Sequence, residues 1–222
     1  ITFIKLLQGQ RVVSVKRRAK LLIFDLSGPI TMLVHLKMTG QFIYRGPNLK
    51  NPKELSIKVV GGVPGKHTHV IFTLDNGGHL YYNDLRRFGW IRILKTPEVL
   101  TSGFVSKLGP EPFNGLTEEN FKETLSKTKR PIKIVIMDQE KIGGVGNIYA
   151  CEACFIAGID PRKRIIELTD QEFKKIHKGV VASLQTGIKY GGSSKTHFAD
   201  PLGRKGLFLD YAFVYGKEKM PC

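Results

Sequence analysis

The sequence predicts an α+β fold in which an antiparallel β-sandwich precedes a helical domain. Two observations predict it. From residue 11 to about residue 96, short runs rich in β-branched and aromatic residues alternate with turn signals. From residue 116 onward, apolar residues recur at the spacing of helices. The pattern changes between residues 97 and 110, which places the domain boundary there.

The first half of the chain divides into strand-like runs separated by turns. These runs cover residues 11–26, 30–44, 55–60, 67–74, 79–85 and 89–94. The turn DNGG at 75–78 is a strong hairpin signal, because type I′ turns need positive φ at both central positions. The runs and turns together predict the antiparallel sandwich.

The second half of the chain carries helix-start signals. Helices are predicted over residues 116–127, 130–141, 146–159 and 169–190. The first begins at Thr117 with Asn120 three residues later, close to a capping box, and the last begins at Thr169 or Asp170. We therefore expect a β-sandwich domain at 1–96, a linker at 97–109, a helical domain at 110–190, a polar loop region at 191–213 and a short terminal segment at 214–222.

The charge balance indicates a polyanionic partner. The 222 residues include 35 Lys and Arg against 19 Asp and Glu, a formal net charge of +16. Such an excess favours nucleic acid or an acidic membrane surface. The basic residues are not gathered on one amphipathic helix, and no apolar run of about 20 residues is present, so no membrane partner is expected. Three cysteines and no signal-peptide pattern favour a reducing cytoplasm.

Three glycines at 143–146 lead into a predicted helix through Asn147. Helix N termini present free N–H groups and a partial positive charge, so this turn is a candidate phosphate site, with Asn147 capping the helix or donating its amide to the anion. A dinucleotide-binding fingerprint fails, because Tyr149 stands at the third small position and βαβ units are missing. The remaining alternative is a connection in which glycine serves geometry alone. Basic residues at 127–133 support the phosphate interpretation, although a solvated charge run explains them equally well.

Two pairs of residues have the spacing of metal ligands. Cys151 and Cys154 form a C-x-x-C pair, but no second pair accompanies them in the helical half, so a core pair is the better interpretation. His67 and His69 are expected to share one strand face. Without a nearby third ligand, they are interpreted as facing DNA or a carboxylate, with a structural histidine as the alternative.

Two turns carry residues that suit insertion into stacked bases. The segment NDLRRFGW at 83–90 places Arg86 and Phe88 on one side of an extended segment, a cation beside a flat ring. In isolation, an exposed arginine and a core phenylalanine are the default interpretation. Met38 in HLKMTG is likewise core by default.

Taken together, these segments resemble the bacterial formamidopyrimidine-DNA glycosylase family over essentially the whole chain. The resemblance is carried by RRAK (17–20), HLKMTG (35–40), KHTHV (66–70), NDLRRFGW (83–90), LGPEPF (108–113), residues 132–161, GGSS (191–194) and VYGKEKMPC (214–222). It implies a β-sandwich, a helix-two-turn-helix domain and a zinc ribbon. It also implies a monomeric bacterial cytoplasmic enzyme, associated with the nucleoid, that binds damaged double-stranded DNA. Such an enzyme excises oxidised purines such as 8-oxoguanine and formamidopyrimidines, and nicks the abasic site by β,δ-elimination.

The resemblance also implies roles for individual residues. Lys20 matches a lysine that assists elimination and contacts phosphate. Met38, Arg86 and Phe88 match the residues that fill the gap left by the extruded base. His67, Arg86 and Lys129 match DNA contacts, Lys133 and Asn147 match phosphate contacts, residues 191–206 match the loop that covers the extruded base, and Cys222 matches the first zinc ligand.

Two family features are not found in the sequence. The family's nucleophile is the amino group of an N-terminal proline that a glutamate follows, whereas Ile1 aligns inside the family's first domain. Cys222 alone cannot make a tetrahedral zinc site, so no bound zinc is expected. We therefore expect this chain to bind DNA without catalysis. The alternative is a non-catalytic nucleic-acid-binding protein that uses the same helix-two-turn-helix.

Overall fold

The structure is a computed structural model that divides into two compact units. It describes residues 2–47, 49, 63–126, 128–193 and 199–221. The first unit, here called the strand unit, comprises residues 1–16, 20–96 and 190–209. The second, the helical unit, comprises residues 17–19, 97–189 and 210–222. The predicted α+β class, an antiparallel sandwich followed by a helical domain, is confirmed.

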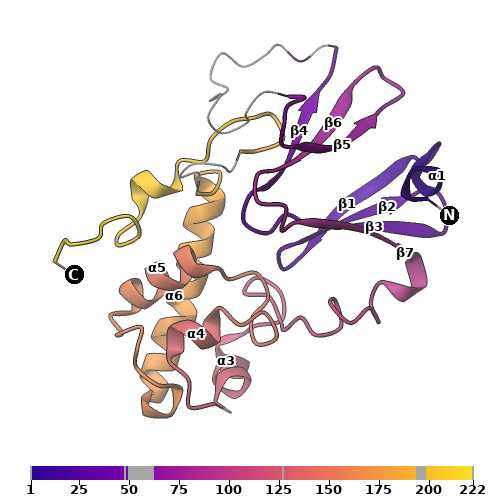
Figure 1. The fold of residues 1–222 in the computed structure, drawn as a ribbon. Coiled ribbons are helices and arrows are strands. Elements are labelled where there is room, and N and C mark those ends of the chain that lie inside the picture. The colour runs from indigo at the N-terminus through magenta and orange to yellow at the C-terminus, as the bar shows by residue number, and fades with distance from the viewer. Residues whose placement is uncertain (1, 48, 50–62, 127, 194–198, 222) are drawn as a thin grey trace. The chain divides into compact units, whose positions relative to one another are not determined.

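The strand unit is built from two antiparallel sheets (Figure 1). A short helix, α1 (Phe3–Leu7), precedes them. One sheet has the order β1 (Val12–Arg18), β2 (Leu21–Leu26), β3 (Ile30–His35) and β7 (Trp90–Lys95). The other has the order β4 (Gly40–Arg45), β6 (His79–Asp84) and β5 (Thr68–Thr73).

Aromatic side chains fill the strand unit's core. Phe42 of β4 meets Phe24 of β2 edge to face, with ring centroids 5.7 Å apart. Its ring also lies 5.5 Å from Tyr82 and 6.2 Å from Phe72, measured between centroids. Such tilted pairs stabilise a core beyond their area burial, by about 0.5–1.5 kcal/mol each. Phe42 thus joins strands of both sheets.

Tight turns divide two of the predicted strands. The run 11–26 breaks at Ala19, whose φ is +51°, and becomes the hairpin of β1 and β2. The run 30–44 breaks at Lys37, whose φ is +52°. A Cβ at Gly40 would lie 2.4 Å from the carbonyl oxygen of Leu36, so this turn leaves no room for a side chain there. Both breaks put a basic residue at the tip of a turn.

The predicted hairpin at DNGG is present, but its turn type differs from the expectation. β5 and β6 pair antiparallel around it. Gly77 has φ +76°, whereas Asn76 is not among the residues with positive φ. The Gly77 N–H donates to the Leu74 carbonyl and the Leu74 N–H donates to the Gly78 carbonyl. The loop is therefore a tight turn with one left-handed glycine and not type I′. The predicted strand at 55–60 lies outside the described residues.

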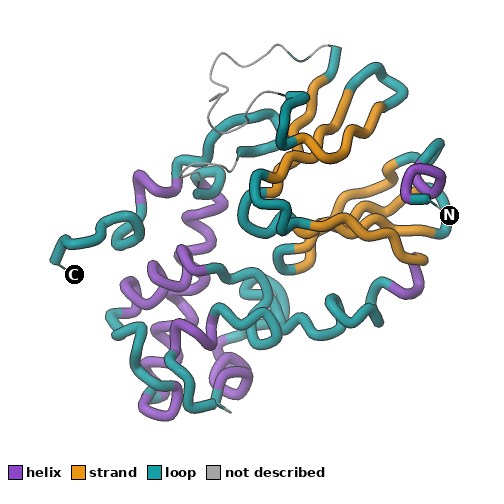
Figure 2. Tube along the Cα trace, viewed as in Figure 1, coloured by secondary structure: helices purple, strands orange, loops and turns teal. Residues whose placement is uncertain are grey.

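The helical unit contains four α-helices in its described residues, drawn purple in Figure 2. They are α3 (Glu118–Leu125), α4 (Ile132–Ile136), α5 (Asn147–Ala157) and α6 (Asp170–Lys189). Short 3-10 turns lie at Thr96–Glu98, Ile165–Glu167 and Phe208–Tyr211, the first and third of them partly in the strand unit. The expected capping box of Thr117 and Asn120 is confirmed. The predicted helix at 130–141 is shorter than expected, because the backbone leaves the helix at Met137. None of the described helices is long and apolar enough to cross a membrane.

Two glycines on α6 let α5 and α6 approach closely. A Cβ at Gly179 would lie 2.5 Å from the carbonyl oxygen of Ala153, and one at Gly187 would lie 2.5 Å from the ring of Tyr149. Fully buried apolar residues from all four helices complete this core, including Phe121, Leu125, Ile132, Ile136, Ala150 and Ile176. The close approach fixes α5, and with it the loop that precedes α5.

A buried glutamate anchors the terminal segment of the helical unit. Glu152 of α5 is 1% exposed. Its carboxylate accepts the N–H groups of Phe213 at 2.6 Å, Val214 at 3.0 Å and Tyr215 at 2.8 Å. Phe213 also stacks on Phe155, with centroids 5.3 Å apart. Three consecutive amides therefore neutralise one buried charge and fix the path of the chain there.

A buried histidine ends β3 in the strand unit. His35 is 8% exposed and its ring lies 5.8 Å from that of Trp90. Burial, followed by the charges of Lys37 and Lys20, lowers the pKa of His35 to about 4. The imidazole is therefore neutral at pH 7.

We expect Glu152→Ala to lower the free energy of unfolding by roughly 2–4 kcal/mol, because three N–H groups lose a charged acceptor. Glu152→Gln should lose less, since its amide oxygen still accepts. Urea denaturation measures both, with the exposed Glu140→Gln as the matched control. A loss below about 0.5 kcal/mol for Glu152→Ala would show that the anchor carries no stability.

Stability should also depend on His35 at acidic pH. Because the folded state disfavours imidazolium, the unfolded chain binds more protons between pH 6.5 and about 4. The stabilisation is complete above pH 6.5 and is lost as the pH falls towards 4, by about 3 kcal/mol in all. Urea denaturation at pH 7 and near pH 4 should show this loss in the wild type and not in His35→Asn. An NMR pKa of 6 or more for His35 would contradict the assignment.

Candidate nucleic-acid interface

The loop between α4 and α5 is organised by one glutamine. The Gln139 amide nitrogen donates to the carbonyls of Met137 and Val145, both at 2.8 Å, and its oxygen accepts the N–H of Gly144 at 2.9 Å. Gly144 has φ +101°, and a Cβ at Gly143 would lie 3.0 Å from a neighbouring backbone carbonyl. Backbone geometry alone therefore accounts for glycine at positions 143 and 144. Whether the loop also binds an anion depends on the N terminus of α5, the helix that follows.

The N terminus of α5 is a candidate anion site. Gly146 is the N-cap residue, in an extended conformation, and no side chain caps the helix. The prediction that Asn147 caps α5 is therefore wrong, because Asn147 is the first helical residue. Its side chain is exposed. An uncapped helix start of this length carries about half a positive charge and open N–H groups, to which an exposed amide can add a donor.

Basic residues lie around the same loop. Lys133 is half-buried in the first turn of α4, and Lys129 is exposed just before α4. Arg130 forms an ion pair with Asp138 at 2.6 Å, so its charge is largely compensated. The described residues give neither Lys129 nor Lys133 an acidic partner. Lys133 thus lies on the helix before the loop, and Asn147 begins the helix after it.

Two turns of the strand unit expose apolar side chains. Met38 is 68% exposed in the turn between β3 and β4, and Phe88 is 55% exposed in the turn between β6 and β7. The guanidinium carbon of Arg86 lies 4.6 Å from the centre of the Phe88 ring. The default interpretations of Met38 and Phe88 as core residues are therefore wrong. The turns meet through Thr39, whose hydroxyl accepts the N–H of Arg86 at 3.0 Å.

Two lysines and a neutral histidine gather at the end of β3. Lys20 occupies the turn between β1 and β2. Desolvation of the ammonium, followed by the charge of Lys37, lowers the pKa of Lys20. The Nδ1 atom of His35 lies 3.0 Å from the Lys37 backbone nitrogen and accepts its N–H, so a neutral ring carries its proton on Nε2. Like charges held this close favour a bound anion.

A buried glutamate fixes the backbone directly before Lys20. The carboxylate of Glu111 accepts the Ala19 N–H at 2.7 Å and forms an ion pair with Arg17. Arg18 donates to the carbonyl of Gly109 at 2.9 Å. All of these contacts lie within the helical unit. They hold Ala19 in its left-handed conformation.

The two histidines of KHTHV do not share a strand face. His67 lies in the turn before β5 and its carbonyl accepts the Asp84 N–H at 3.0 Å. His69 lies on β5, with its Nε2 2.8 Å from the Asp84 carbonyl oxygen. The predicted common face is therefore wrong, because the strand begins at Thr68. Among the residues that the structure describes, no three His, Cys, Asp or Glu side chains gather as metal ligands would.

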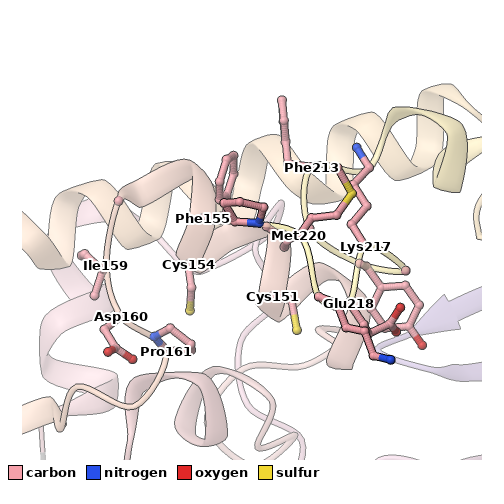
Figure 3. A pocket seen from close by; sticks show the side chains of 16 residues that line it. Cys151, Cys154, Phe155, Ile159, Asp160, Pro161, Phe213, Lys217, Glu218 and Met220 are labelled. Carbon is pink, nitrogen blue, oxygen red and sulfur yellow. The ribbon is translucent and has the colours of Figure 1, made fainter.

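The cysteine pair lines a pocket of about 960 Å³ in the helical unit. Figure 3 shows Cys151 and Cys154 on α5 facing it, with Phe155, Phe213 and Met220 nearby. Burial, followed by the neighbouring Cys151, raises the pKa of Cys154 to about 12. A thiol this reluctant to ionise is a poor metal ligand. Cys154 is buried as the core interpretation predicts, whereas Cys151 is half-buried. Cys222 lies outside the described residues.

The polar loop after α6 is attached to β4 of the strand unit. The Tyr44 N–H donates to the Pro201 carbonyl at 2.7 Å, and Ala199 packs on Ile43. Asp200 and Arg204 form an ion pair at 2.7 Å within the loop. Residues 194–198 of the predicted base-covering loop lie outside the described residues.

Sequence reasoning missed the residues that organise these loops. They are Gln139, Asp84, Glu111 and Thr39, each of which accepts or donates several hydrogen bonds. Each stands within or beside a quoted motif. The available signal was a polar residue that flanks a turn containing glycine. Such a residue often satisfies the backbone of the turn.

Comparison with known proteins gives the same family for both units. A family model described as the formamidopyrimidine-DNA glycosylase N-terminal domain matches residues 1–91, and one described as the H2TH domain of that enzyme matches residues 108–199. The formamidopyrimidine-DNA glycosylase of Bacillus licheniformis is 36% identical over 221 residues, covering 99% of this chain and 75% of that protein. Its namesake from Rickettsia massiliae is 40% identical over 212 residues, covering 95% of this chain and 71% of that protein.

Solved structures agree with these sequence matches. The crystal structure of the MutM (Fpg) protein from Thermus thermophilus has a TM-score of 0.83 and 32% identity, covering 98% of this chain and 76% of that chain. The complex of Lactococcus lactis Fpg with DNA containing an abasic site has a TM-score of 0.83 and 30% identity, covering 98% of this chain and 75% of that chain. On this evidence, from its strands to its helix-two-turn-helix, the chain belongs to the formamidopyrimidine-DNA glycosylase family.

Proposed function

We propose that this chain recognises damaged double-stranded DNA as part of a glycosylase and AP lyase that removes oxidised purines, such as 8-oxoguanine and formamidopyrimidines, in base excision repair. The observation that carries the proposal is the exposed set Met38, Arg86 and Phe88 on two turns joined by Thr39. Exposed apolar side chains do not stabilise a surface that faces only water, whereas a protein that extrudes a base uses such side chains to fill the gap in the base stack.

The exposed side chains of Met38, Arg86 and Phe88, here called the wedge, insert between stacked bases. Extruding a base costs a few kcal/mol, and inserted apolar side chains offset this by filling the gap. Phe88 offers a flat face for stacking. Arg86, held over that ring, brings a positive charge to the strand opposite the extruded base. Met38 fills the space that remains.

The helix-two-turn-helix binds the DNA backbone. The open N terminus of α5, the exposed amide of Asn147 and the ammonium of Lys133 supply donors to one phosphate. Lys129 and His67 provide further backbone contacts. These contacts do not distinguish one base from another, so they should contribute equally to the affinity for damaged and undamaged duplexes.

Lys20 acts beside the extruded nucleotide. Its Nζ contacts a backbone phosphate, and its lowered pKa suits a group that passes protons during β,δ-elimination. The loop at 191–206 covers the extruded base, and its described part is already attached to β4. We further propose that the protein works as a monomer.

Zinc has no place in this proposal. The family resemblance gives one candidate ligand, Cys222, which lies outside the described residues, and the described residues bring no three candidate ligands together. The proposal therefore names no residues as a zinc site. No step is assigned to a metal.

Phe88→Ala should reduce the preference for a duplex with an abasic-site analogue or 8-oxoguanine over an undamaged duplex. Loss of base stacking corresponds to roughly 1–3 kcal/mol of that preference. Fluorescence anisotropy measures it, with the exposed Phe113→Ala as the matched control. An unchanged preference would favour the alternative, a non-catalytic protein that binds nucleic acid through its helices.

Asn147→Ala and Lys133→Ala should weaken binding to damaged and undamaged duplexes by the same factor. For Lys133→Ala, the slope of log affinity against log salt should fall by about 0.9, the value for one lost phosphate contact. The exposed Lys178→Ala on α6 removes the same charge elsewhere and serves as the control. A loss confined to damaged DNA would show that these residues do not bind a phosphate.

A further inference from the structure

The two turns that expose Met38 and Phe88 meet at a single buried carboxylate. Asp84 ends β6 and is 1% exposed, directly before the turn that carries Arg86 and Phe88. Thr39, directly after Met38, is 8% exposed. The wedge side chains are thus exposed while the residues next to them are buried.

Asp84 uses both of its carboxylate oxygens. Oδ1 accepts the Thr39 hydroxyl at 2.5 Å and the Arg86 N–H at 3.2 Å. Oδ2 accepts the Gly89 N–H at 2.8 Å and faces the Tyr82 hydroxyl at 3.5 Å. The Arg86 N–H is shared with the Thr39 hydroxyl oxygen. One charge therefore holds both ends of the Arg86 to Gly89 turn and, through Thr39, the Met38 turn.

The backbone of both turns needs such support. Arg87 has φ +58° and Lys37 has φ +52°, conformations that non-glycine residues rarely adopt. A Cβ at Gly89 would lie 2.0 Å from the Tyr82 hydroxyl, so the turn closes against the core. Residues held in such conformations persist only when neighbouring contacts fix them. Burial alone would raise the pKa of Asp84, but the Thr39 hydroxyl and the backbone N–H donors hold it below its ordinary value, so the carboxylate stays charged.

We propose that Asp84 is a positioning residue which, through Thr39, holds the Met38 turn and the Phe88 turn in one arrangement before DNA binds. The three exposed side chains then enter the duplex as a single preformed unit. Ordering them beforehand removes an entropic cost that would otherwise weaken every lesion complex. This inference rests on the proposed function, because it gives the two turns a common task.

The test compares Asp84→Asn and Thr39→Val with the wild type. Asp84→Asn keeps the shape and removes the charge, Thr39→Val keeps the shape and removes the link, and Thr39→Ser retains the hydroxyl. Binding to a duplex with an abasic-site analogue and to an undamaged duplex is measured by anisotropy. Insertion of the exposed side chains into the gap is followed by the fluorescence of 2-aminopurine placed opposite the analogue. The exposed Asp75→Asn on the neighbouring hairpin is the matched control.

We expect Asp84→Asn and Thr39→Val to lose affinity for the abasic duplex by about tenfold to a hundredfold, because three side chains must then be ordered on binding. Affinity for undamaged DNA should stay within about twofold, since phosphate contacts elsewhere carry it. Thr39→Ser should resemble the wild type. In a Phe88→Ala background, Asp84→Asn should have little further effect, because the main insertion group is already missing. A merely structural role for Asp84 would not produce this dependence.

Equal losses on both duplexes, or an Asp84→Asn variant that keeps its preference, would overturn the positioning role. Should Asp84→Asn fail to fold, Thr39→Val alone decides the question. Trypsin cleavage after Arg86 and Arg87 in the free protein reports the rigidity of the turn independently of DNA, and both variants should speed it severalfold. A wild type without preference for the abasic duplex would sink the proposed function, while unchanged trypsin cleavage in the variants would sink the positioning claim by itself.

Discussion

A carboxylate removed from water must find hydrogen-bond donors, and three buried acids impose this constraint on the fold. Asp84, Glu111 and Glu152 are each less than 9% exposed, and each accepts backbone N–H groups from a loop. An uncompensated buried charge is destabilising by several kcal/mol, so each loop keeps the one conformation that supplies its N–H groups. The loop fixed by Asp84 carries Arg86 and Phe88, and the turn fixed by Glu111 leads into Lys20. The segment fixed by Glu152 is bound to α5, the helix that begins at Asn147.

The distribution of charge follows from the same constraint. The chain has 16 more basic than acidic residues, yet several acids turn inward to hold backbone. Basic residues such as Lys129 before α4 and Lys37 after β3 face solvent. Such a surface attracts a polyanion at long range, and under the proposed function the exposed side chains of the strand unit would meet the base stack at short range. The proposal thus assigns affinity and lesion recognition to different parts of the molecule.

Local sequence pattern predicted the fold class, the strands around Phe42 and the capping box at Thr117, because these depend on residues near in sequence. It failed where distant residues decide a dihedral angle. The left-handed conformation of Ala19 depends on Glu111, 92 residues away, and nothing local signals it. The exposure of Met38 and Phe88 was expected only through the family resemblance, since an apolar residue is core by default. The partner of Thr39 lies 45 residues away, so the link between the two turns required the structure.

Buried carboxylates fix these loops in the free protein. Native-state amide hydrogen exchange tests it most directly, because the N–H groups of Ala19, Gly89 and Phe213 lie in loops or at exposed positions and would exchange freely without a partner. All three amides should be strongly protected in the absence of DNA. Exchange of these amides at the rate of an unstructured chain would contradict it.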